Sequence, residues 1–389
     1  MNFPFSRKAL ILYAGLAFGV LTALLVNWGN PPNMGFCSLC FLRDIAGALK
    51  LHVAGAAITT ATPPAIGAST TAYLRPEIIG LVIGALAAAL LFREFRPRGG
   101  ASPLIRFFLG AFIAVGALIF LGCPWRMVIR LGGGDLSALI GLAGLMTGVS
   151  LGVFFLRRGF NLGRATRTYA VAGWLMPAFF IGLLALAIAY PVFLAKSTGG
   201  PGSMRAALGV SLAVGLFIGF VAQRVRFCTM GGWRDLILVK DTYLFLGIVG
   251  LFIGVLVTNY IVGNFGTGTL LGVDVNYHWG FTKQPIALPG VDANGKLRIA
   301  DFFMDFGGLA LVGLAAALAG GCPLRQLVMS GEGDADAGMT VFGMLVGAGL
   351  TMTFLVASSA TAVGKYGVWG LAISLAACII LGFTMREKA

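Results

Sequence analysis

The sequence predicts an all-α, polytopic helical membrane protein built as an inverted-topology repeat, and three observations support this fold class. The composition is 58% hydrophobic and only 11% charged, with a mean hydropathy of +0.92, which leaves too little polar surface for a soluble globular protein. Apolar runs of about 20 residues, the length that crosses a bilayer as a helix, follow one another along the chain. Finally, two short polar motifs each occur twice, as expected for a duplicated bundle.

About ten apolar segments have spanning length. They lie near residues 10–28, 78–93, 103–121, 137–156, 169–194, 206–223, 243–263, 303–320, 338–360 and 366–385. The first has no small-residue cleavage site after it, so we expect a retained anchor and not a signal peptide. Four further segments are too short and too rich in glycine, proline and charge to cross, and are predicted to be re-entrant half-helices lining a cavity. They are residues 37–50, 123–135, 228–239 and 322–334.

The distribution of lysine and arginine predicts the orientation. If the N-terminus is cytoplasmic and every segment crosses once, 17 of the 28 basic residues lie on the inner side, as the positive-inside rule requires. Both termini are then cytoplasmic, in a bacterial-type plasma (inner) membrane, and the odd span at 169–194 inverts the second half. The predicted parts are a first repeat (1–160), a linking span (161–200), an inverted second repeat (201–362) and a C-terminal span (363–389).

The distribution of charge excludes one class of partner. Basic residues in the loops of a membrane protein meet anionic lipid headgroups, which accounts for the net charge of +14. No basic run is interleaved with aromatic residues, so membrane lipid is expected as a partner and nucleic acid is not.

The longest polar loop, 264–302, is predicted to lie outside as a surface loop or a small lid, with 54–77 as its counterpart.

The repeated motifs carry the residues with chemistry. The first motif is Phe36-Cys37-x5-Arg43-Asp44, which returns 191 positions later as Phe227-Cys228-x5-Arg234-Asp235. The second is Gly122-Cys123-Pro124-x-Arg126-x5-Gly132-x-Gly134-Asp135, which returns 199 positions later as Gly321-Cys322-Pro323-x-Arg325-x5-Gly331-x-Gly333-Asp334. Burying polar and charged side chains in so apolar a chain costs free energy, so thiols, arginines and aspartates repeated there indicate a functional role. Both copies are therefore predicted to build one central site.

Not all six cysteines are expected to act. Cys378 has no partner in the repeat and is interpreted as a packed apolar residue. Cys40 aligns with Gly231, so chemistry shared by the two halves cannot require its thiol. A zinc site is not expected, because Cys37-x2-Cys40 has no second pair and neither histidine has ligand spacing, and no cofactor is predicted. The cysteines kept in both copies are predicted to form a substrate path: Cys37, Cys123, Cys228 and Cys322.

The Gly-Cys-Pro sequence predicts how two of these thiols are presented. Proline suits the first position of a helix, which leaves Cys123 and Cys322 at the N-cap of their half-helices. Free backbone N–H groups and the positive end of the helix dipole then lie beside each thiol, where they attract an anion.

The charged motif residues are assigned supporting roles. Arginines one turn into the second motif either contact an anion or neutralise the aspartates that end the motif, and their joint recurrence favours pairing. The Arg-Asp neighbours of the first motif are interpreted as structural. The supporting residues are Arg126, Arg325, Asp135, Asp334, Arg43, Asp44, Arg234 and Asp235.

These four motif segments resemble those of the YeeE/YedE membrane transporters, which import sulfur compounds such as thiosulfate. The resemblance extends over roughly residues 10–385. Residues 320–338 are most similar to the YedE-like branch proposed to carry a selenium compound. The resemblance implies an inverted-repeat helical protein whose short helices meet at mid-membrane, where Cys123 and Cys322, with Cys37 and Cys228 beside them, pass the substrate along. It also implies a cytoplasmic sulfur or selenium carrier protein of the TusA-like type as a partner.

The sequence therefore predicts import of a small selenium- or sulfur-containing anion by a protein that is not an enzyme. The absence of a Gly-x4-Gly-Lys-Ser/Thr motif argues against direct ATP coupling. The alternative is a quinone-coupled membrane thiol-disulfide oxidoreductase that uses Cys37 and Cys40, since Cys-x2-Cys is a redox spacing. A third class is a pore for a neutral solute in which the cysteines only pack half-helices.

Overall fold

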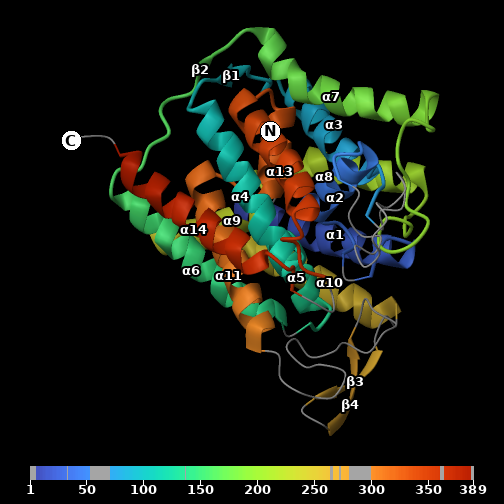
Figure 1. Ribbon diagram of the computed structural model, residues 1–389. Coiled ribbons are helices and arrows are strands. Elements are labelled where there is room, and N and C mark those ends of the chain that lie inside the picture. The colour runs from blue at the N-terminus through green and yellow to red at the C-terminus, as the bar shows by residue number, and fades with distance from the viewer. Residues whose placement is uncertain are drawn as a thin grey trace.

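The protein is a bundle of long apolar helices interrupted by short ones (Figure 1). The computed structural model describes residues 6–32, 34–52, 71–135, 137–262, 266–270, 273–279, 299–359 and 363–386. Most of the predicted loops 54–77 and 264–302 therefore lie outside the described residues. In the latter, β3 (Gly266–Leu270) and β4 (Val273–Trp279) form an antiparallel hairpin.

Ten helices correspond to the ten predicted spans, which confirms the predicted fold class as an all-α polytopic membrane protein. In the described residues they are α1 (Arg7–Asn27), α3 (Pro76–Leu91), α4 (Pro103–Phe120), α6 (Ser137–Arg157), α7 (Ala170–Ala189), α8 (Leu208–Val225), α10 (Tyr243–Val262), α11 (Ile299–Ala319), α13 (Ala335–Thr353) and α14 (Gly367–Thr384). Nine of these are long and apolar enough to cross a membrane, while α3 has 16 residues. At 1.5 Å per residue α3 is about 24 Å long, short of a bilayer core of about 30 Å.

The four predicted half-helices are also present. They are α2 (Ser38–Ala48), α5 (Pro124–Gly132), α9 (Thr229–Val239) and α12 (Pro323–Gly331). Three of them follow a span after a residue with positive φ: Leu121 at 62°, Arg226 at 53° and Gly320 at 85°. A left-handed residue ends one helix and turns the chain at once into the next, so each break falls next to a repeated cysteine.

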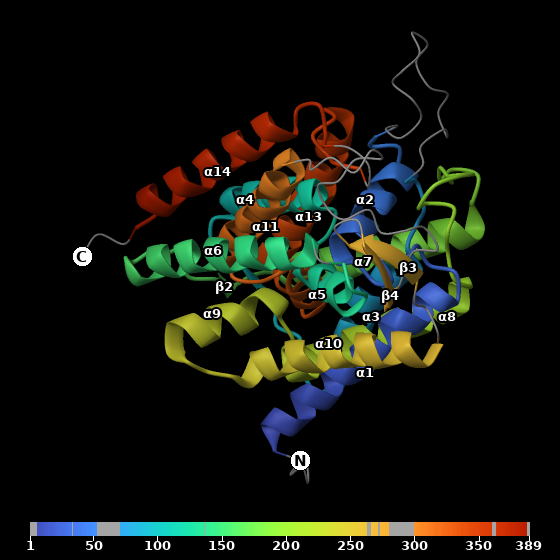
Figure 2. The same cartoon turned by 90° about the horizontal axis from the view of Figure 1, so that it is seen from below.

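The long helices pair across the two copies of the motifs. Helix α1 packs on α10, and α8, which occupies the place of α1 in the second copy, packs on α3. In the same way α4 packs on α13 and α11 packs on α6, while α4 and α11 contact each other. Ranges 1–160 and 201–362 are therefore intertwined (Figure 2). The odd helix α7 lies against α3, α12 and α13, and α14 against α4 and α11.

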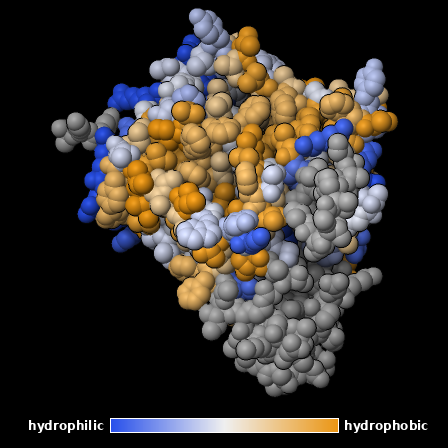
Figure 3. All heavy atoms as spheres, viewed as in Figure 1, coloured by the Kyte–Doolittle hydropathy of each residue, from blue (hydrophilic) through white to orange (hydrophobic). Residues whose placement is uncertain are grey.

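Glycine makes these crossings close. A methyl group on Gly148 of α6 would overlap the carbonyl oxygen of Ala310 in α11, and one on Gly84 of α3 would overlap that of Leu216 in α8. Small residues let membrane helices approach until their backbones touch. This close packing stabilises the bundle in lipid, where the hydrophobic effect does not drive helices together. Apolar side chains cover much of the outward face that would meet lipid (Figure 3).

We expect Gly148→Val to lose most of its folded protein, because the added side chain must push α6 away from α11 and break a buried contact. The control is Gly182→Val in α7, where a Cβ meets nothing within 4 Å. Yield and thermal midpoint of the detergent-purified variants measure the difference. Equal yields for the two variants would contradict close packing at the α6–α11 crossing.

One end of the bundle gathers the segments predicted to be cytoplasmic. Strand β1 (Arg98–Gly99), between α3 and α4, pairs with β2 (Thr166–Arg167), between α6 and α7. The Arg98 guanidinium pairs with Asp334, at 2.7 Å, just before α13. The chain beside Arg386 pairs with Phe160, which brings the C-terminal end to the same place.

The opposite end gathers segments predicted to lie outside. The amide of Ala195 donates to the carbonyl of Ala48 at 2.9 Å, and the amide of Ser197 donates to that of Ala72 at 2.8 Å. The predicted alternation of sides therefore agrees with the way the connecting segments cluster in space. The side of the membrane that each end faces stays a prediction.

Candidate functional site

Each of the four half-helices begins at one of the repeated cysteines. Cys123 and Cys322 are the N-caps of α5 and α12, each followed by proline, as the sequence predicts. Cys37 and Cys228 are the N-caps of α2 and α9, and their sulfurs accept backbone bonds from Cys40 N at 3.4 Å and Gly231 N at 3.1 Å. The duplication therefore keeps a sulfur at the positive end of every half-helix.

The thiols meet in two pairs inside the protein. Cys37 Sγ lies 3.8 Å from Cys123 Sγ, and Cys228 Sγ accepts a bond from Cys322 N at 3.4 Å. All four side chains are buried and none forms a disulfide. Residues 86 and 94 positions apart are thus brought into contact by the fold.

Aromatic rings connect the two pairs. Trp125 lies in the first turn of α5, and its ring centroid is 5.9 Å from Phe36, 5.4 Å from Phe227 and 5.6 Å from Phe18 of α1. Phe36 and Phe227 directly precede Cys37 and Cys228, and α5 also contacts α9 while α12 contacts α2. The four caps therefore belong to one site between the two halves.

Cys40 also belongs to this site, although alignment with Gly231 set it aside. Its sulfur accepts a hydrogen bond from Arg126 Nη1 at 3.2 Å. Gly122 leaves the room for that arginine, since a Cβ there would lie 3.0 Å from Arg126 Cδ. Comparison of the two halves does not reveal a residue that lies at the site in only one of them.

Three buried polar atoms near the thiols have no hydrogen-bond partner in the described chain: Ser38 Oγ, Thr229 Oγ1 and Trp125 Nε1. Ser38 and Thr229 directly follow Cys37 and Cys228, so a hydroxyl recurs at the same place in both motif copies. Leaving a buried polar group unpaired costs roughly 1–3 kcal/mol, and in native proteins such groups call for a reason. The repeated hydroxyl was the signal that could have revealed these residues.

The expected pairing within the second motif is wrong in its partners. Asp135 pairs with Arg130 at 2.7 Å and also accepts from Ser137. In the other half Asp334 pairs with Arg98, and Arg325 pairs with Glu332 at 2.9 Å. The aspartates follow their half-helices at the turn into the next helix, where Asp334 caps α13, so an arginine in the first turn points elsewhere.

In the first motif each arginine forms an ion pair with the aspartate beside it, which is what the structural interpretation expects. Asp44 is completely buried and bridges two arginines, Arg43 and Arg75, each at 2.7 Å. The second-half pair, Arg234 with Asp235 at 2.8 Å, is about a quarter exposed. The same motif is thus a buried ion-pair network in one half and a partly exposed ion pair in the other.

Among the described residues no group of three or more histidine, cysteine, aspartate or glutamate side chains could hold a metal ion. His52 instead lies within 3.0 Å of the carbonyl oxygen of Arg43, and His278 is in β4, whose side chains are not described. Neither a comparison with protein-family models nor a search of curated proteins finds a match for this chain. The case for a function therefore depends on the geometry of the cysteine-capped half-helices.

Proposed function

We propose that this protein imports a small selenium- or sulfur-containing anion through the four cysteine caps, without direct use of ATP. The carrying observation is that four half-helices direct their N-termini, each occupied by a cysteine, toward one interior site. The motif resemblance to YeeE/YedE transporters supports the same substrate class and a cytoplasmic carrier as acceptor.

The chemistry of the site suits a soft anion. Helix N-termini offset negative charge inside the membrane without a metal or a lysine. Polarisable thiols contact sulfur or selenium, and the unpaired groups of Ser38, Thr229 and Trp125 can donate hydrogen bonds to a passing anion. Several weak contacts in series let the ion leave as readily as it arrives, which transport requires.

A second function is favoured by one contact. The amide of Cys40 lies on Cys37 Sγ, one helical turn away, and the Cys40 sulfur accepts from Arg126. In a quinone-coupled oxidoreductase, these two thiols would become a disulfide and pass two electrons and two protons to a quinone. Cys40→Ser separates the two functions: uptake that survives it supports transport, whereas loss of a thiol oxidation cycle together with all activity supports the enzyme.

The direct test is uptake into proteoliposomes of labelled selenite, selenide, sulfite and thiosulfate, offered side by side. We expect one of these anions to accumulate at least tenfold faster than in protein-free vesicles, and to be displaced by its unlabelled form. A neutral solute such as glycerol is the control for a general pore. Equal permeation of glycerol and all four anions, or permeation of none, contradicts the proposal.

A further inference from the structure

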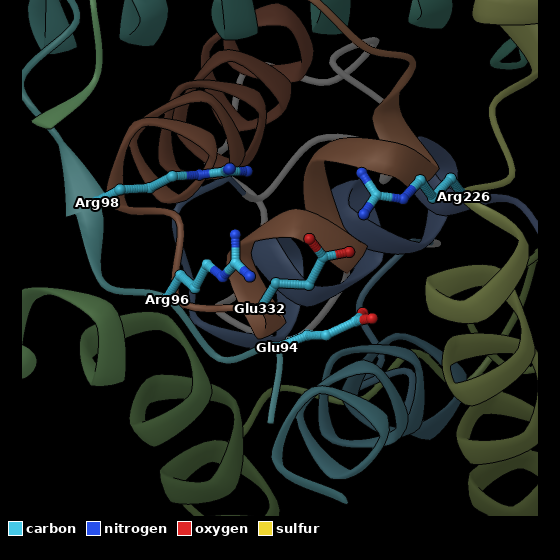
Figure 4. Close-up of a pocket in the computed structure, with 5 residues that line it drawn as sticks. All are labelled: Glu94, Arg96, Arg98, Arg226 and Glu332. Carbon is cyan, nitrogen blue, oxygen red and sulfur yellow. The ribbon is translucent and has the colours of Figure 1, made fainter. Parts of the chain in front are cut away.

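A pocket of charged residues opens where the segments predicted to be cytoplasmic converge (Figure 4). Its volume is about 140 Å³. Three separate connections supply its walls: the α3–α4 segment, the α8–α9 break and the end of α12. The lining residues are Glu94, Arg96, Arg98, Arg226 and Glu332.

The two carboxylates of the pocket are already neutralised. Glu94 accepts from Gln223 at 2.7 Å and pairs with Arg224 at 3.1 Å. These bonds, that of Gln223 first, lower the pKa of Glu94, so it stays ionised at neutral pH. Glu332 pairs with Arg325 at 2.9 Å.

The arginines are compensated only in part. Arg98 pairs with Asp334 at 2.7 Å. The guanidinium groups of Arg96 and Arg226 have no acceptor in the part of the chain that the structure describes, and Figure 4 shows that of Arg226 directed across the pocket toward Glu332. Two positive charges therefore remain on the pocket walls without a hydrogen-bonded carboxylate among the described residues, although the charge of Arg226 contributes to the lowered pKa of Glu94.

The pocket lies next to the cysteine pair of the second half. Arg226 ends α8 and is followed by Phe227 and Cys228. Glu332 is the C-cap of α12, the half-helix that Cys322 begins, and its partner Arg325 lies one turn after that cysteine. A charged mouth and a thiol pair are thus joined by nine residues of helix.

We propose that this pocket binds a small oxyanion of the sulfite, selenite or thiosulfate class between Arg96 and Arg226, at one mouth of the cysteine path. The inference rests on the proposed function and deepens it by adding a site. Planar guanidinium groups match oxyanion geometry and bind in two-point fashion. The volume holds several waters, each about 30 Å³, yet is well below the roughly 300 Å³ at which pockets for larger organic ligands begin.

The test is equilibrium binding of thiosulfate and of selenite to the purified full-length protein in detergent, measured by calorimetry at fixed ionic strength with chloride as the competing arm. We expect Arg96→Gln and Arg226→Gln each to weaken binding roughly tenfold, the worth of one charged contact, and the double variant to lose it. Arg226→Lys should retain charge but recover only part of the affinity. Arg164→Gln, an exposed arginine away from the pocket, should bind as wild type.

Wild-type affinity in the double variant, or displacement by chloride as easily as by oxyanions, overturns the site. Unchanged thermal midpoints without ligand establish that the variants are folded. The failure of the site and the failure of transport are separable. Lost binding in the double variant with retained binding by Arg164→Gln supports the pocket, whereas full uptake by a protein that binds no oxyanion removes the pocket and leaves the transport function in place.

Discussion

Cys123→Ala and Cys322→Ala are each expected to abolish anion uptake, by at least a hundredfold, while the protein still folds. Both cysteines cap half-helices: Cys123 Sγ contacts Cys37 Sγ, and the backbone amide of Cys322 donates to Cys228 Sγ. Removing one sulfur deletes a polarisable contact from the single substrate path, yet takes away only a small buried group. Initial uptake rates in proteoliposomes, normalised to reconstituted protein, measure the loss.

The matched control is Cys378→Ala in α14, which removes an equally buried thiol that has no equivalent in the repeat. It should transport as wild type. The path model is wrong if Cys123→Ala and Cys378→Ala have the same uptake rate. A fall in yield for Cys123→Ala alone would instead indicate that the caps serve packing, as the pore hypothesis requires.

Asp44→Ala should be the most destabilising single change in the first motif, by about 3–5 kcal/mol. The substitution leaves Arg43 and Arg75 without their shared carboxylate in the interior. Arg75 also donates to the carbonyls of Pro201 at 2.8 Å and Met204 at 3.0 Å, which hold the segment before α8. Monodisperse yield and thermal midpoint after extraction report the effect.

Asp235→Ala is its counterpart in the second half and should change stability by no more than about 1 kcal/mol, because the Arg234–Asp235 pair is partly exposed and isolated. Comparable loss in the two variants would show that burial does not set the worth of these pairs. Comparable tolerance would show that the Asp44 network carries little of the fold.

Measurements of uptake and yield should distinguish the two groups of charged residues. The Arg43, Asp44 and Arg75 network holds the half-helix α2 in place, so its loss lowers yield and uptake together. The guanidinium groups of Arg96 and Arg226 bear on the anion itself, so their loss lowers affinity while yield is kept. The two kinds of charge thus give distinct signatures in the same pair of measurements.

The fold was predictable because the bilayer imposes it. A chain with 58% apolar residues must satisfy its backbone in helices, and each run of spanning length becomes one. Two of the half-helices, α5 and α12, were predictable together with their caps from local chemistry: a proline that suits the first turn places the cysteine at the N-cap, and Cys123 and Cys322 stand there.

What the sequence by itself determined is therefore the helices, the half-helix breaks and the two Gly-Cys-Pro caps, since all depend on contacts within a few residues. The tertiary structure alone decided which charges pair: Asp135 with Arg130, and Arg325 with Glu332, both against the expected motif partners. It also decided that Cys40 joins the site and that Arg226 reaches the pocket. Such choices are made by segments that approach only after the helices cross, and the free energy of pairing a buried charge depends on whichever side chain the fold has brought within reach.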